Sequence, residues 1–219
     1  MTAVIDSASV PGARRPARRK SHRLRPEQEA ALFLTRWLKA PHRIGAVAPS
    51  SRGLGRAMAR EIDVGGNGIV IELGGGTGSI TRALLERGLA PDRLVVVERD
   101  RTLAALLRKR FPGLRIVRGD ASALTQLLAP LTIGAADAVV SSLPLLSMPK
   151  RIKQQIVQES FALLGEHGTF IQFTYGVASP LAGAAFGLAG EPGKRVWANF
   201  PPAVVWRYRR SPAPIAKVA

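Results

Sequence analysis

The sequence contains no cysteine among its 219 residues. A disulfide framework, a thiolate metal site and a cysteine nucleophile are therefore excluded, and the composition is compatible with a reducing compartment. The three histidines, His22, His42 and His167, are scattered along the chain without the spacing of metal ligands. We therefore predict no metal site.

Long hydrophobic runs are also missing, because no apolar stretch approaches the about 20 residues that a helix needs to span a bilayer. The amino terminus lacks the apolar segment of a secretory signal. Acidic side chains are scarce, with 15 Asp and Glu against 32 Lys and Arg, and the formal net charge is +17. Such an excess attracts polyanions and anionic membrane surfaces.

The order of composition along the chain predicts one α/β domain with short appendages. Residues 1–25 form a basic disordered tail, whose segment 14–25 holds seven basic and no acidic side chains. Residues 26–66 are expected to form amphipathic helices that act at the membrane or as a lid. Residues 67–212 form the main domain, and residues 213–219 are a second tail.

The first helix is predicted from Pro26 to Ala40, where apolar residues including Phe33 and Trp37 recur at the spacing of one helix face. Cationic side chains beside such a face are typical of an interfacial membrane helix. The same residues would equally serve to pack the helix on the sheet or on a cofactor. A second short helix is expected after Pro49-Ser50-Ser51, because a serine can cap it.

Alternating strands and helices are predicted for the rest of the chain, which implies a mostly parallel sheet covered on both faces. The expected strands are residues 68–73, 94–98, 115–118, 136–141 and 169–175, with helices at about 79–88, 101–110, 122–129 and 149–164. Two closing runs, 195–200 and 204–209, predict an antiparallel hairpin at the sheet edge.

A glycine loop provides the strongest functional signal. In the segment ELGGGTGS, Gly74, Gly76 and Gly78 follow a strand and precede a helix, so the backbone can turn sharply and approach a ligand. Ser79 stands where the dinucleotide fingerprint would place its last glycine, which disfavours NAD.

Carboxylates follow the strand ends near this loop. Glu98 ends the second strand, twenty residues after Gly78, where it can accept hydrogen bonds from both hydroxyls of a ribose. Asp120 follows the third strand and is a candidate to hold an adenine amino group, and Glu72 can lie near a methionine moiety. Each carboxylate alone could be an ordinary loop residue, but their joint order and spacing indicate a nucleoside cofactor.

These motifs resemble those of the class I S-adenosylmethionine-dependent methyltransferases over residues 68–175. The resemblance implies a Rossmann-like fold with a seven-stranded, mostly parallel sheet and S-adenosylmethionine as cofactor. It implies cofactor binding by Glu72, Gly74, Gly76, Gly78, Glu98, Asp120 and Ser141.

The blocks GAVAPSS, SSLPLL and QFTYG further resemble the bacterial phospholipid N-methyltransferases related to rRNA adenine dimethyltransferases, over roughly residues 29–210. This resemblance implies conversion of phosphatidylethanolamine to phosphatidylcholine by a cytoplasmic enzyme bound peripherally to the inner face of the membrane. An rRNA or other nucleic-acid adenine methyltransferase is the main alternative. Leu145, where such enzymes carry an aromatic residue, and the 5% aromatic content argue against a nucleic-acid partner. A non-catalytic cofactor-binding or scaffold protein remains a third possibility.

The acceptor amine is expected at the carboxyl end of the fourth strand. Backbone carbonyls around Ser142 and Leu143 and the hydroxyl of Tyr175 are the candidates to hold it, although Tyr175 could be a structural aromatic. His42 and Arg43 are candidates to meet the lipid phosphate, with a solvated loop as the alternative. An anionic membrane surface is the expected partner, through Phe33, Trp37 and the basic tail.

Overall fold

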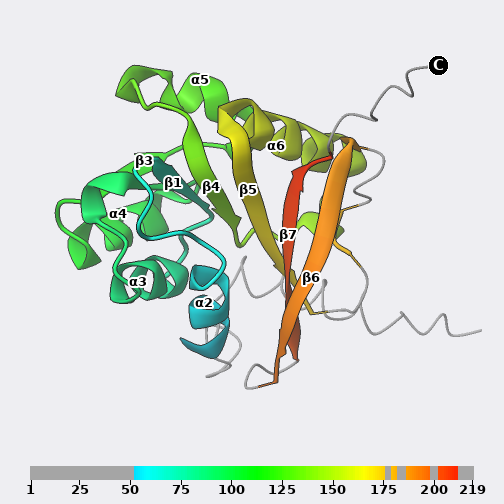
Figure 1. The fold of residues 1–219 in the computed structure, drawn as a ribbon. Helices are drawn as coiled ribbons and strands as arrows, with labels where there is room; N and C mark the ends of the chain where they lie inside the picture. Colours follow the sequence, from blue (N-terminus) through cyan, green and yellow to red (C-terminus); the bar gives the residue numbers. More distant parts are fainter. Residues whose placement is uncertain (1–51, 176–178, 182–185, 198–201, 212–219) are drawn as a thin grey trace, which may run out of the picture.

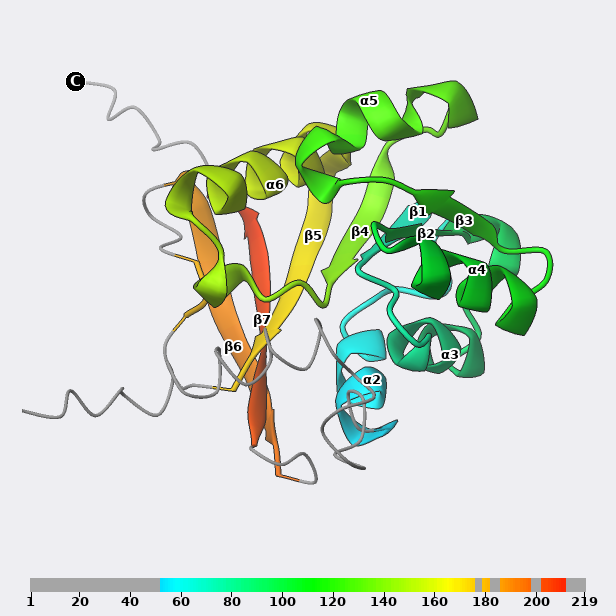
Figure 2. The same cartoon turned by 180° about the vertical axis from the view of Figure 1, so that it is seen from behind.

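A single mixed sheet with helices on both faces forms the core of the protein (Figures 1 and 2). The computed structural model describes residues 52–175, 179–181, 186–197 and 202–211. The predicted basic tail, the helix at 26–40 and the candidate lipid-binding residues Phe33, Trp37, His42 and Arg43 lie outside the described residues.

The sheet has seven strands in the order β3-β2-β1-β4-β5-β7-β6. The first five are parallel to one another, whereas β7 pairs antiparallel with both β5 and β6. The strands are β1 Ile69–Leu73, β2 Leu94–Glu98, β3 Arg115–Arg118, β4 Ala136–Ser141, β5 Leu164–Thr174, β6 Leu188–Val196 and β7 Ala203–Arg210.

The helices connect these strands and cover the two faces. They are α2 Arg52–Ala59, α3 Ser79–Glu86, α4 Arg101–Arg110, α5 Leu124–Leu128 and α6 Lys150–Leu163, with short 3-10 turns η1 Pro91–Arg93, η2 Ala121–Ala123, η3 Ala129–Leu131 and η4 Leu145–Ser147. Asp100 begins α4 by accepting a hydrogen bond from the Leu103 amide at 2.9 Å, as an N-cap residue does.

Two hydrophobic clusters fill the space between the sheet and its helices. One lies under α2, α3 and α4 and includes Met58, Leu84 and Val96; the other lies under α5 and α6 and includes Leu73, Leu124 and Phe170. Because β1 and β2 are buried on both faces, their sequences read as nearly continuous apolar runs. That is why their positions are visible in the sequence.

The predicted α/β architecture is confirmed, but one strand was misplaced. The hairpin was expected to begin at residue 195, whereas β6 begins at Leu188 and ends at Val196. β6 is the edge strand, and its segment Ala189-Gly190-Glu191-Pro192-Gly193 is mostly exposed, so no hydrophobic alternation marks it. β5 also begins earlier than expected, at Leu164 instead of Thr169.

Helix α2 packs in the core next to the sheet. Leu54 and Met58 are fully buried, and Ile62 just beyond the helix is 3% exposed. Gly55 permits close contact with α3, since a Cβ there would lie 3.1 Å from the Ala83 Cβ. The described part of the predicted N-terminal helical region is therefore continuous with the core of the main domain.

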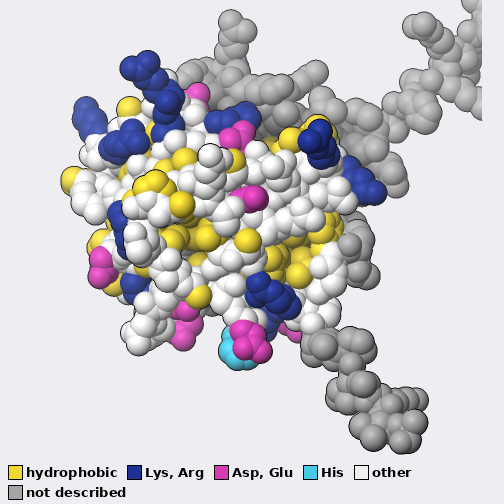
Figure 3. Space-filling model, turned by 90° about the horizontal axis from the view of Figure 1, so that it is seen from above, with side chains coloured by type: hydrophobic (Ala, Val, Ile, Leu, Met, Phe, Trp, Pro, Cys, Tyr) yellow, Lys and Arg dark blue, Asp and Glu magenta, His cyan; other side chains and the backbone are white. Residues whose placement is uncertain are grey.

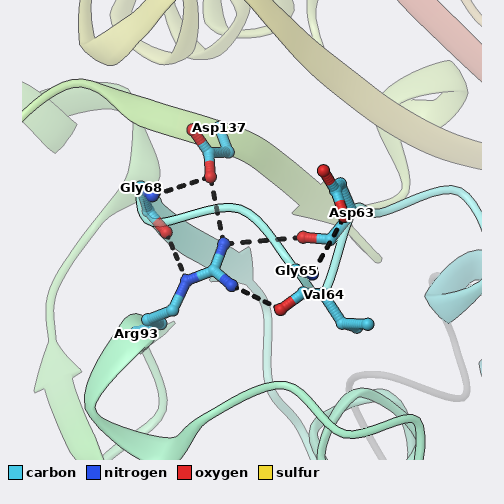
Figure 4. Close-up of polar contacts among 6 residues, drawn as sticks. All are labelled: Asp63, Val64, Gly65, Gly68, Arg93 and Asp137. Atoms are coloured by element: carbon cyan, nitrogen blue, oxygen red, sulfur yellow. Dashed lines mark hydrogen bonds and ion pairs between the residues drawn. The ribbon is translucent and has the colours of Figure 1, made fainter.

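Arg93 fastens the turn before β1 to the amino end of the sheet (Figure 4). Its guanidinium donates to the carbonyls of Gly68 and Val64, each at 2.7 Å, and pairs with Asp137 on β4 at 3.0 Å. The Asp137 carboxylate in turn accepts from the Gly68 amide at 2.8 Å. This network fixes the end of the sheet opposite to the glycine loop.

Basic side chains are spread around the rim of the face seen from above, with hydrophobic side chains between them (Figure 3). The positive charge on that face is therefore distributed and not gathered in one groove. No helix among the described residues is both long and apolar enough to cross a membrane.

Candidate active site

The carboxyl ends of the parallel strands bring the predicted site residues together. Leu73 at the end of β1 is aligned with Val97 of β2 on one side and with Ser141 of β4 on the other. The glycine loop follows Leu73, and the segment Ser142–Met148, here called the acceptor loop, follows Ser141. Open α/β sheets bind their ligands at this edge, near the point where the strand order reverses.

Three of the four glycines in the loop, Gly74, Gly76 and Gly78, adopt positive φ angles of 77°, 54° and 86°, but their surroundings differ. A Cβ on Gly74 would lie 2.9 Å from Leu143 Cδ2, and one on Gly78 would lie 2.4 Å from the Phe111 ring. Of the residues that the structure describes, a Cβ on Gly76 would meet only the Gly74 carbonyl oxygen, at 3.8 Å. Gly74 and Gly78 thus permit close packing, whereas Gly76 faces open space that a ligand can fill.

Glu98 holds the glycine loop in position. One carboxylate oxygen accepts from the Gly76 amide at 2.9 Å and the other from the Asp100 amide at 2.8 Å. The residue is only 8% exposed. Since each carboxylate oxygen can accept more than one hydrogen bond, both can still receive the hydroxyls of a ribose.

Glu72 is fully buried beneath the loop. Its Oε2 accepts from the Thr81 hydroxyl at 2.7 Å, whereas Oε1 has no hydrogen-bond partner within the described part of the chain. Burial raises the pKa of Glu72 to about 8, although the hydrogen bonds from Thr81 act in the opposite direction. A carboxyl with a free buried oxygen in this place can receive a cationic group of a ligand.

Asp120 lies at the carboxyl end of β3, next to β2. Its Oδ1 accepts from the amide and hydroxyl of Ser122, and its Oδ2 lies 3.5 Å from Arg99 Nη1. The hydrogen bond from the Ser122 amide is the main cause that lowers the pKa of Asp120, and Arg99 adds to it. The exposed Oδ2 can still accept a hydrogen bond from an amino group of a ligand.

These features fit S-adenosylmethionine. Glu98 would provide acceptors for ribose hydroxyls, Asp120 an acceptor for adenine, and the buried Glu72 carboxyl a partner for the positively charged methionine part. Gly76 leaves space for the cofactor between them. The amino end of α3 follows directly, where free amide groups favour a negatively charged carboxylate.

The acceptor loop is bonded to the glycine loop. The Ser142 hydroxyl donates to the Gly74 carbonyl at 2.5 Å and to the Leu73 carbonyl at 3.1 Å, and its amide also donates to Leu73. The Leu143 carbonyl accepts from the Leu145 amide at 2.8 Å and from Gln172 Nε2 at 3.0 Å. An amine that binds this carbonyl therefore has to share it with two donors.

Ser141 and Tyr175 lie on opposite faces of the sheet near this loop. Ser141 is fully buried, and its hydroxyl oxygen accepts from the Leu143 amide at 3.4 Å. Tyr175 packs edge-on against Phe173, with ring centroids 5.4 Å apart, on the side of α2 and α3. The structure thus gives Tyr175 a packing contact, and its role toward an amine stays a prediction.

Two residues of this region have no role in the sequence-based prediction. Gln172 of β5 is 2% exposed and donates to the Leu143 carbonyl of the acceptor loop. Trp206 of β7 is aligned with Gln172 across the sheet. Gln172 opens the block QFTYG, but the sequence assigns it no role, and Trp206 lies in no motif; only the pairing of β5 with β7 brings the two residues together.

Comparisons with known proteins indicate a methyltransferase domain. A family model described as a methyltransferase domain matches residues 70–168. The ornithine lipid N-methyltransferase of Singulisphaera acidiphila is 40% identical over 146 residues, which cover 65% of this chain and 76% of that protein. The ribosomal RNA small subunit methyltransferase A of Phenylobacterium zucineum is 42% identical over 92 residues, covering 41% of this chain and only 30% of that protein.

Solved structures show the same fold at low sequence identity. The 1,6-didemethyltoxoflavin-N1-methyltransferase of Burkholderia thailandensis, solved with its substrate and S-adenosylhomocysteine, has a TM-score of 0.60 at 18% identity. The match covers 86% of this chain and 92% of that structure. Its sheet and helices are therefore arranged like those described above.

Proposed function

Because this chain belongs to the class I S-adenosylmethionine-dependent methyltransferases, we propose that it methylates the primary amine of a membrane lipid headgroup. The observation that carries the proposal is the extent of the similarity. It reaches over 76% of the ornithine lipid N-methyltransferase, but over only 30% of the ribosomal RNA methyltransferase. The shared part of the latter is too short to include most of that protein.

Phosphatidylethanolamine is the substrate that we propose, with phosphatidylcholine as the final product. The blocks SSLPLL and QFTYG support it through their resemblance to the phospholipid N-methyltransferases. Ornithine lipid is the second candidate because of the relative from Singulisphaera acidiphila. Both headgroups present a primary amine, so the acceptor loop would have to bind the same chemical group in either lipid.

When bound, S-adenosylmethionine supplies an electrophilic methyl group on its sulfonium. The residues of the chain have to place the amine nitrogen in line with that group and let it lose a proton. The bonds from Ser142 to Gly74 and Leu73 hold the acceptor loop against the glycine loop, so the two reactants are brought together in a fixed orientation. Such positioning replaces a bimolecular encounter and can supply much of the acceleration.

The acceptor loop suits an aliphatic amine better than a flat base. Leu145 is buried in the cluster under α6, and Leu146 is 43% exposed. The segment Ser142–Met148 contains no aromatic side chain on which an adenine could stack. It also contains no Asp, Glu or His. Neutral hydroxyl and carbonyl oxygens of this segment would therefore accept hydrogen bonds from the N–H groups of the amine.

Binding at the membrane surface is part of the proposal. Residues 14–25 would attract an anionic surface, and Phe33 and Trp37 would insert beneath it. His42 and Arg43 would contact the lipid phosphate. These residues precede α2, whose core packing fixes the point from which the N-terminal segment leaves the domain.

Incubation with methyl-labelled S-adenosylmethionine tests the proposal. Vesicles containing phosphatidylethanolamine, vesicles containing ornithine lipid, and rRNA serve as parallel substrates, with the Glu98→Ala variant as a control for cofactor-dependent labelling. We expect label in the lipid fraction and none in rRNA. Label in rRNA alone would favour a nucleic-acid methyltransferase, and label in ornithine lipid alone would correct the headgroup.

A further inference from the structure

Among the described residues, two of the buried side-chain polar atoms that lack a hydrogen-bond partner belong to aligned residues of β5 and β7. They are Gln172 Oε1, an acceptor, and Trp206 Nε1, a donor. Buried polar atoms in folded proteins nearly always have a partner, so each such exception calls for an explanation. Because the two residues are aligned on neighbouring strands, one ligand could satisfy both atoms.

The sheet places both residues in one row that leads from the glycine loop. Leu73 is aligned with Ser141, Ser141 with Gln172, and Gln172 with Trp206. Aligned residues on neighbouring strands share a face, and directly opposed residues of antiparallel strands have their Cβ atoms about 4.5 to 5.5 Å apart. Gln172 and Trp206 are therefore close neighbours on the face that also carries the acceptor loop.

The orientation of the Gln172 amide is fixed by its surroundings. Nε2 donates to the Leu143 carbonyl at 3.0 Å and to the Phe173 carbonyl at 2.9 Å. A reversed amide would direct its oxygen at two carbonyl oxygens, so Oε1 has to be the atom without a partner. The indole of Trp206 is held by the ring of Tyr208, with centroids 6.2 Å apart and planes inclined by 16°.

We propose that Gln172 and Trp206 form a headgroup subsite of the lipid substrate. Gln172 Oε1 accepts an N–H of the lipid amine, and the Trp206 indole N–H donates to an anionic oxygen of the same headgroup. The subsite rests on the proposed function and specifies its substrate class, a zwitterionic aminolipid. One acceptor and one donor on aligned residues of neighbouring strands match a molecule that carries an ammonium and an anionic oxygen a few bonds apart.

The contact of Gln172 with the acceptor loop would place the headgroup near the methyl group that is transferred. The Gln172 amide binds the acceptor loop through Leu143, so a headgroup that contacts Oε1 is held beside the segment that receives the methyl group. Phosphatidylethanolamine offers a phosphate oxygen to Trp206, and an ornithine headgroup offers a carboxylate oxygen. Both lipids fit the same two contacts, and the two lipid arms of the test separate them.

The Trp206→Phe variant removes the indole N–H and keeps an aromatic ring. We expect its KM for lipid to rise about tenfold, the equivalent of one hydrogen bond, with unchanged affinity for S-adenosylmethionine. Its Tm should stay the same or rise, because an unpaired buried donor is lost. Gln172→Met, which removes both polar atoms of the amide, should raise the KM for lipid as well.

Tyr208→Phe is the matched control on the same strand and face. The Tyr208 hydroxyl already pairs with Ser179 Oγ at 2.6 Å, so this variant should lose stability and keep the KM for lipid. An unchanged KM in Trp206→Phe and Gln172→Met, with a parent enzyme that methylates lipid, would overturn the subsite and leave the proposed function intact. A parent that methylates no lipid would overturn the proposed function and the subsite with it.

A binding measurement gives a readout that does not require turnover. In the ¹⁵N-labelled protein, the Trp206 indole resonance can be assigned by its loss in Trp206→Phe. We expect glycerophosphoethanolamine to shift it, and inorganic phosphate at the same concentration to leave it in place. An equal shift with inorganic phosphate would show a simple anion site and overturn recognition of the zwitterion.

Discussion

Glu98 accepts a hydrogen bond from the Gly76 amide at 2.9 Å, across the 22 positions that separate them in the sequence. The contact joins the end of β2 to the tip of the glycine loop. The other carboxylate oxygen accepts from the Asp100 amide before α4. The residue expected to bind the cofactor ribose therefore also shapes the loop on which the cofactor would lie.

Replacing Glu98 with Ala should weaken the binding of S-adenosylmethionine by at least about 1.5 kcal/mol, the value of a hydrogen bond to a charged group. Both the ribose acceptor and the support of Gly76 are lost in this variant. Isothermal titration calorimetry measures the effect. Glu86→Ala, an exposed carboxylate on α3, is the control and should bind like the parent. An unchanged affinity in Glu98→Ala would remove this residue from the site.

Comparing Gly76→Ala with an alanine variant of another glycine at positive φ should separate the effect of backbone strain from that of lost cofactor contact. A Cβ there strains a residue with φ of 54° and projects into the space assigned to the cofactor. Gly187→Ala introduces comparable strain at φ of 64°, with nothing within 4 Å of the new atom. Both variants should lose on the order of 1 kcal/mol of stability, but only Gly76→Ala should lose cofactor affinity. Equal affinities in the two variants would place the cofactor elsewhere.

The pKa of Glu72, raised by burial to about 8, predicts a pH dependence of stability. The folded protein keeps this proton up to about pH 8, whereas the unfolded chain releases it near the ordinary glutamate pKa of 4.5. The folded state therefore binds more protons within this window. The contribution of Glu72 to the free energy of unfolding is complete below the window and is lost as the pH rises through it.

The comparison of Glu72→Gln with the parent isolates this effect, because all other titrating groups are retained. Urea unfolding from about pH 5 to about pH 8 should show a decrease in the parent that is smaller in the variant. Parallel profiles would show that Glu72 is ionised in the folded protein. Bound S-adenosylmethionine, which is positively charged, should favour the ionised carboxylate and release a proton.

Replacing Phe33 and Trp37 together with Ser should reduce binding to anionic vesicles more than deletion of residues 1–25. The two aromatic side chains each bury a large apolar area on insertion, whereas the tail supplies charge attraction that salt screens. Co-sedimentation with neutral and anionic vesicles at low and high salt measures both contributions. A double variant that folds, binds cofactor and sediments like the parent would make this helix a packing element.

The parallel strands of the core could be predicted because strands buried on both faces have nearly continuous apolar sequences. The strands β2, β3 and β4 have the bounds expected from their apolar runs. β6 could not be placed, because an exposed edge strand containing Gly190 and Pro192 shows no alternation. Its position depends on pairing with β7, a contact that the local sequence does not reveal.

The sequence offers more candidates for the cofactor side of the site than for the acceptor side. The glycine loop and Glu98 occupy fixed positions relative to strand ends, so their spacing is informative. Gln172 and Trp206 carry polar side-chain atoms within strands, and only the register of β5 and β7 aligns the two residues. Similarly, the two donors that occupy the Leu143 carbonyl cannot be inferred from the segment SSLPLL.

Mass spectrometry of the lipid products from vesicles of purified phosphatidylethanolamine and an anionic lipid tests most directly whether the protein methylates this lipid. With excess S-adenosylmethionine, we expect mono-, di- and trimethylated headgroups to form in succession, the trimethylated product to accumulate, and Glu98→Ala to form far less of each. Phosphatidylethanolamine that stays unmodified under conditions in which the protein binds both cofactor and vesicles would contradict it.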